Sequence, residues 1–111
     1  MALVTLEEAK NYLRVSTSDE DAMISYLIQA AEIKTRDIAR IPDDRWVEVI
    51  ADPDTEDPAE VVDLRSVCKV AVLYTMAYLF EHREEADHHG LDITLRNWLS
   101  AVREGVIRSS G

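Results

Sequence analysis

The sequence is poor in the residue types on which most reactive sites depend. Cys68 is the one cysteine, so no disulfide can form within the chain, and the apolar residues around it predict a buried structural thiol. The three glycines, Gly90, Gly105 and Gly111, are too few and too widely spaced for a loop that cradles phosphate. No serine stands in a nucleophile elbow, and the paired carboxylates fall in expected loops and turns, where they meet solvent. We therefore expect no enzyme.

Long apolar segments are also missing. The longest stretch without a charged residue covers positions 70–80, about half the length that a membrane-spanning helix requires. The N-terminal residues lack the basic region and the apolar core of a signal peptide. These features predict an intracellular protein with no membrane partner.

Basic side chains are few, and the formal net charge is −10. The acidity is concentrated in residues 41–65, which carry 2 basic and 9 acidic side chains. Such a surface repels phosphate, so we expect no tight binding to nucleic acid.

Three histidines, His82, His88 and His89, lie close to several carboxylates in the sequence. A zinc site needs three or four converging ligands with fixed outer partners. Histidines at the end of a helix more commonly complement the helix dipole and meet solvent. We expect neither a metal nor any other cofactor.

Against these absences stands a clear helical pattern. Thr5 and Glu8 have the spacing of a capping box, which predicts a short helix ending near Arg14. Ser18 and the acidic residues after it are typical of a second helix start, so we expect a helix over about 19–40. One face of that helix collects apolar residues at helical spacing: Ile24, Leu27, Ile28, Ala31 and Ile38.

Residues 41–57 have a different character. The run Trp46-Val47-Glu48-Val49-Ile50 alternates as a short strand does, between turns that contain Pro42 and Pro53. A single strand needs a partner. Two forms of this excursion are open: a mobile segment ordered by a neighbouring subunit, or a β-hairpin closed within the chain.

The sequence Asp57-Pro58-Ala59-Glu60 predicts the start of a third helix, which we expect to reach about residue 85. This helix has apolar residues on two sides, which indicates a central helix with surface to share with a neighbouring subunit. A fourth helix is expected at about 92–104, with a flexible tail at 106–111. The predicted fold is mainly α: one domain, 1–105, formed by a small bundle of about four helices. The two apolar stripes of the third helix are Leu64, Val67, Ala71, Tyr74 and Tyr78, and Val70, Leu73, Ala77 and Phe80.

The order of these motifs resembles the head–tail connector proteins of tailed bacteriophages, also called head-completion or adaptor proteins. The first part of the resemblance is Leu6-Glu7-Glu8-Ala9-Lys10 and Tyr12-Leu13-Arg14-Val15, followed by Asp19-Glu20-Asp21 at a helix start. The second is the stretch from Lys69-Val70-Ala71 to Phe80-Glu81-His82-Arg83-Glu84. The acidic segment 41–57 has no counterpart in this pattern.

The resemblance implies a structural virion protein, assembled in the bacterial host cytoplasm and located in the virion neck. It implies a ring of twelve copies that meets the portal protein on one side and a neck or tail-completion protein on the other, with DNA passing through unbound. An alternative from charge alone is a small acidic inhibitor, antitoxin or DNA mimic that acts on a basic partner. The residues expected at subunit or partner contacts are Trp46, Val47, Val49, Ile50, Val70, Leu73, Ala77, Phe80 and Arg83.

Overall fold

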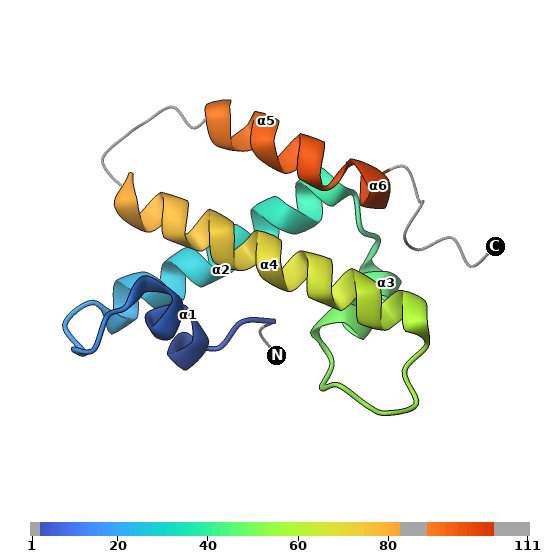
Figure 1. Ribbon diagram of the computed structural model, residues 1–111, viewed down its shortest axis with the longest axis horizontal. Helices are drawn as coiled ribbons and strands as arrows, with labels where there is room; N and C mark the ends of the chain where they lie inside the picture. The colour runs from blue at the N-terminus through green and yellow to red at the C-terminus, as the bar shows by residue number, and fades with distance from the viewer. Residues whose placement is uncertain (1–2, 83–88, 104–111) are drawn as a thin grey trace.

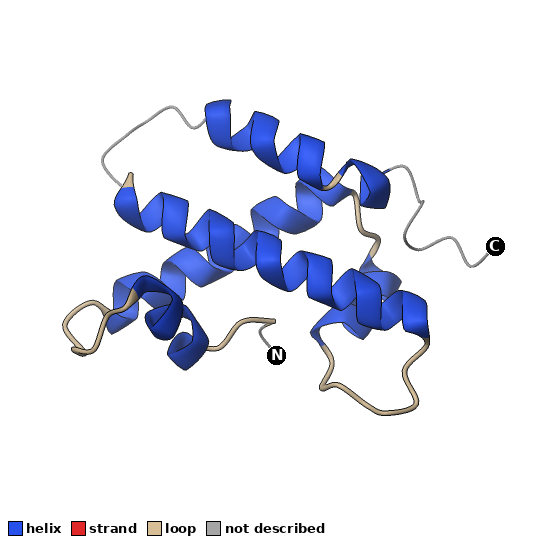
Figure 2. Ribbon diagram, viewed as in Figure 1, coloured by secondary structure: helices blue, strands red, loops and turns tan. Residues whose placement is uncertain are grey.

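The computed structural model describes residues 3–82 and 89–103, and these residues form helices joined by short loops (Figures 1 and 2). The expectation of a mainly α fold is confirmed. No strand occurs within the described ranges, so the expected β-hairpin is wrong. In chain order the helices are α1 Leu6–Leu13, α2 Asp21–Ala39, α3 Asp43–Ile50, α4 Ala59–Glu81, α5 His89–Trp98 and α6 Ser100–Arg103.

The N-terminal helix forms as the capping box predicts. The Thr5 hydroxyl accepts a hydrogen bond from the Glu8 amide at 3.1 Å, and the Glu8 carboxylate accepts one from the Thr5 amide at 3.1 Å. The helix ends at Arg14, which takes the left-handed conformation with φ of 61°. The start of α2 is less well predicted, because it begins at Asp21 and no side chain caps it at Glu20.

The core lies between α2 and α4, which make the most extensive contact in the fold. Figure 1 shows α4 crossing in front of α2, with α1 and α5 on either side. The buried face of α2 is the predicted one, since Ile24 and Ala31 are fully buried and Leu27 packs against the core. Ala31 and Ala71 are both fully buried, and their small side chains let the two helices approach closely.

The largest departure from expectation is residues 43–50, which form α3 and not a strand. Pro42 precedes the helix, and Asp43 and Asp44 occupy its first turn, where carboxylates favour the positive helix end. The same run of residues fits both periods, but Trp46 and Val49 lie on one face only if it is helical. Val49 is fully buried and Trp46 packs against the core, so burial in the bundle selects the helix.

The C-terminal half follows the prediction in outline. Pro58, not Asp57, occupies the N-cap of α4, and the carboxylate of Asp57 instead accepts bonds from Asp54 and Arg65. The last helix of the prediction, expected at about 92–104, begins earlier, at His89, and is divided at Leu99 into α5 and α6. The expected tail 106–111 and the stretch 83–88 lie outside the described residues.

Candidate subunit and partner interface

The second predicted stripe of α4 forms a surface on the side of the helix away from α2. Val70 is 48% exposed, and Leu73, Ala77 and Phe80 are half-buried along the same side. Phe80 also packs against the core, so less of its side chain is available to a partner. We call Val70, Leu73 and Ala77 the α4 stripe. Arg83, which we expected beside it, lies outside the described residues.

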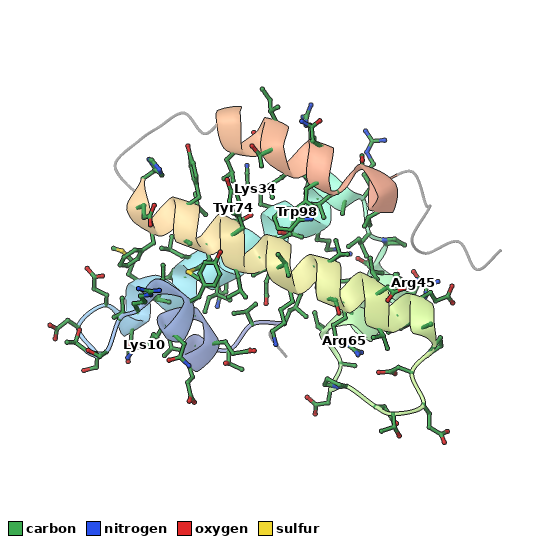
Figure 3. All side chains as sticks on the ribbon, in the orientation of Figure 1. Lys10, Lys34, Arg45, Arg65, Tyr74 and Trp98 are labelled. Carbon is green, nitrogen blue, oxygen red and sulfur yellow. The ribbon has the colours of Figure 1, made fainter. Side chains whose placement is uncertain are left out.

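An aromatic pair borders the α4 stripe. The rings of Tyr74 in α4 and Trp98 in α5 meet edge to face, with their centroids 5.9 Å apart (Figure 3). Both side chains remain more than a third exposed. Because aromatic side chains combine large contact area with few rotatable bonds, this pair extends the surface available to a partner.

The other predicted contact residues belong to α3 and divide between core and surface. Val47 is 62% exposed and points away from the bundle. Trp46 and Ile50 are half-buried against the core, where the Arg36 guanidinium lies 5.9 Å from the Trp46 ring centroid. Val49 is fully buried, so its expected role in a partner contact is wrong: the helical form of this segment turns it inward.

Arg65 of α4 fastens α3 and the following loop to the bundle. Its Nε donates to the Val49 carbonyl at 3.1 Å and its Nη2 to the Glu48 carbonyl at 2.9 Å. Its Nη1 donates to Asp57 at 3.0 Å. The last carbonyls of a helix have no partner within the helix, and α3 has no basic residue in its own last turn. Arg65 supplies both the donors and the charge.

The basic side chains around α3 and the start of α4 are paired with carboxylates. Lys69 binds Glu8, and this contact is the main reason that the pKa of Glu8 lies below its ordinary value. A hydrogen bond from the Asp54 amide, followed by the bond from Arg65, lowers the pKa of Asp57. The charged residues that line an open depression of about 220 Å³ are Glu8, Asp52, Arg65 and Lys69. Glu8, Arg65 and Lys69 each already have a partner of opposite charge.

Sequence analysis missed one exposed apolar surface, on α2. Tyr26 and Ile33 are 71% and 70% exposed, the largest values among the exposed large hydrophobic side chains, and Met23 is 42% exposed. With the exposed Ala30 they recur at spacings of three, four and three residues. That spacing is the narrow a/d pattern of helices that pack on one another, and it was present in the sequence. We call Met23, Tyr26, Ala30 and Ile33 the α2 seam.

Nothing in the described residues resembles a reactive centre. Burial raises the pKa of the Cys68 thiol to about 12, as fits a structural cysteine. Within 3–82 and 89–103 no three histidine, cysteine or carboxylate side chains are placed to hold a metal ion; His88 and the side chain of His89 lie outside what is described. None of the helices in these ranges is long and apolar enough to cross a membrane.

A match to a known protein family covers residues 3–98. Over this range the chain matches a family described as phage gp6-like head-tail connector protein. Searches of curated proteins and of solved structures found no match. The match spans α1 to α5, including both apolar surfaces and the α3 segment that the sequence resemblance left unaligned. This chain therefore belongs to the family of phage gp6-like head–tail connector proteins.

Proposed function

We propose that this protein forms a ring, of about twelve copies, that joins the portal vertex of a DNA-filled phage head to the neck or tail. The ring extends the channel through which DNA leaves the head. Its partners are the portal protein on one side and a neck or tail-completion protein on the other. Membership of the connector family supports the joining role and favours it over the alternative of an acidic inhibitor.

The α4 stripe is the observation that carries the assembly part of this proposal. A chain with net charge −10 repels its own copies, so a contact between copies needs a surface with little charge. The stripe lies within residues 70–80, where no residue is charged, and Val70 leaves about half of its surface in contact with water. Burying such a side chain contributes about 1 to 2 kcal/mol.

The acidic segment fits the passage of DNA. The loop between α3 and α4 exposes Asp52, Asp54 and Glu56, and nothing in the structure neutralises them by ion pairing within the described residues. Such carboxylates facing the channel would let DNA move without sticking, because the release of counterions that drives DNA binding requires cations on the protein. We therefore expect no shift of a DNA duplex in a gel at micromolar protein and physiological salt.

The test removes the protein from the phage or prophage that encodes it. DNA-filled heads and free tails should accumulate unjoined, and purified protein added to such an extract should restore infectious particles. Val70→Asp should fail to restore them while keeping the helical circular dichroism and melting temperature of the wild type. Ile93→Asp, a change of similar size on the exposed side of α5, serves as the control. Joining that proceeds without the protein would refute the proposal.

A further inference from the structure

The α2 seam is an apolar surface with no partner in the described part of the chain. The residues on the other side of the helix, Ile24, Ile28, Ala31 and Thr35, are buried against the core. By the 3.6-residue period the seam lies opposite them and points away from the bundle. Around the seam this side of α2 adds only Ala22 and Gln29, so it is free of charge for three turns.

The seam and the α4 stripe lie on opposite sides of the molecule. The buried faces of α2 and α4 meet in the core, and each apolar surface is on the side of its helix turned away from that contact. Figure 1 shows the two helices as front and back layers, and the shortest dimension of the molecule is 20 Å. A flat subunit with a different apolar surface on each side has the form needed for head-to-tail contacts.

Both surfaces end in charged side chains, and Arg40 at the end of the seam is opposite in sign to the carboxylates at the ends of the stripe. Beyond Ile33 the same spacing continues into Asp37 and Arg40, which are both exposed and have no ion pair among the described residues. An open depression of about 350 Å³ beside the seam is lined by Ile33, Arg36, Asp37, Arg40 and Ile41. Arg36 is already paired with Asp43, so Arg40 is the cation of this depression without a described partner. Exposed carboxylates flank the α4 stripe along the helix: Asp63 before Val70 and Glu81 after Ala77. Neither has an ion pair among the described residues.

From these observations we infer that the α2 seam of one copy receives the α4 stripe of the next copy, in a head-to-tail contact. The inference rests on the proposed function, because it assigns the two sides of the subunit contact in the ring. The apolar side chains of the stripe cover Tyr26, Ala30 and Ile33, and a carboxylate at one end of the stripe reaches the depression beside Arg40. A self-pairing of two seams would instead stop at a dimer and would leave both α4 stripes uncovered.

The first experiment uses one variant on each surface. Ile33→Asp and Val70→Asp each place a carboxylate in the contact, and each should weaken self-association at least about tenfold, because an unpaired charge would be buried. Ile93→Asp should associate as the wild type does. An equimolar mixture of the two defective variants retains one intact seam and one intact stripe, so native mass spectrometry should show a heterodimer and nothing larger. A mixture that stays monomeric, beside a wild type that associates, would overturn the pairing.

The second experiment detects the contact even where association of the free protein is weak. Ile33→Cys and Val70→Cys variants are mixed with a short bismaleimide cross-linker, and the buried Cys68 does not compete for it. Cross-links between Ile33→Cys and Val70→Cys should exceed those within either variant alone by several-fold. They should also exceed the cross-links that either variant forms with Ile93→Cys. Products of Ile33→Cys alone, or no excess over the Ile93→Cys control, would overturn the inference.

The outcomes separate this inference from the proposed function. Loss of head–tail joining in Ile33→Asp together with unchanged self-association would show that the seam serves another partner, and the connector role would stand while the head-to-tail pairing would fail. Cross-linking of the purified variants as expected, together with head–tail joining in a phage that lacks the protein, would leave the head-to-tail pairing standing and refute the connector role.

Discussion

Replacement of Arg65 by methionine should release α3 from the bundle without unfolding the rest. The side chain of Arg65 is 12% exposed and makes its three bonds to the Val49 carbonyl, the Glu48 carbonyl and Asp57. Hydrogen bonds from a charged donor contribute about 1.5 to 3 kcal/mol each, but water can replace part of this where the acceptors are accessible. Methionine keeps most of the apolar stem and removes every donor.

We therefore expect a local cost of about 3 kcal/mol for the attachment of α3, which corresponds to roughly a 100-fold loss of protection against hydrogen exchange. Exchange at the amides of residues 46–51 measures this directly, and amides in the middle of α4 provide the internal reference. Arg65→Lys keeps the charge but cannot reach three acceptors, so it should recover less than half of the protection. Asp57→Asn, which spares both carbonyl bonds, should change it little. Unaltered exchange in Arg65→Met would refute this account of what holds α3.

The other predictions concern thermal stability. Lys69 lowers the pKa of Glu8, so the free energy of unfolding should be larger for the wild type than for Glu8→Gln. This difference should be complete at neutral pH and should disappear as the pH falls through the lowered pKa of Glu8. Glu32 should show the opposite sign, because burial raises its pKa. Its contribution to stability relative to Glu32→Gln is present at acid pH and falls as the pH rises above 4.5, the ordinary pKa of glutamate. Melting curves from about pH 3.5 to 7, a range that contains this pKa, check both predictions. The hydroxyls of Thr35 and Thr75 are buried without a described partner, so the double change to valine should raise the melting temperature by the equivalent of about 1 to 2 kcal/mol, and a fall would contradict this.

The parts of the fold that could be predicted are those fixed by neighbours in the sequence. The capping box of α1 is complete within four residues, and the buried face of α2 follows from the spacing of its apolar side chains. The α3 segment could not be decided in this way, because Trp46 to Ile50 satisfies both an alternating and a helical pattern. The helix is selected by the burial of Val49 in the bundle and is held there by Arg65, which is 16 residues away in the sequence from the Val49 carbonyl that it binds.

The candidate interface was predicted in part for a related reason. Two apolar stripes were recognised on α4 because the helix has so few charges between Val70 and Phe80. On α2 the stripe that includes Ile24 and Ala31 is enough for an ordinary amphipathic helix, so the pattern alone does not distinguish a second apolar surface from scattered exposed residues. The spacing of Met23, Tyr26 and Ile33 carried the information, but only the structure shows that no helix within residues 3–82 and 89–103 covers them.

The packing of α2 against α4 would have a consequence for the number of subunits in the proposed ring. If the two outer surfaces meet head to tail, the angle between them sets the turn from one copy to the next, and twelve copies close when this turn is about 30°. A turn without closure gives a helical filament. Ala31 and Ala71 are fully buried in the layer that separates the two surfaces and lie in neither of them. A larger side chain at either position would tilt one helix against the other, so that in the proposed ring the number of copies would depend on packing inside a single subunit.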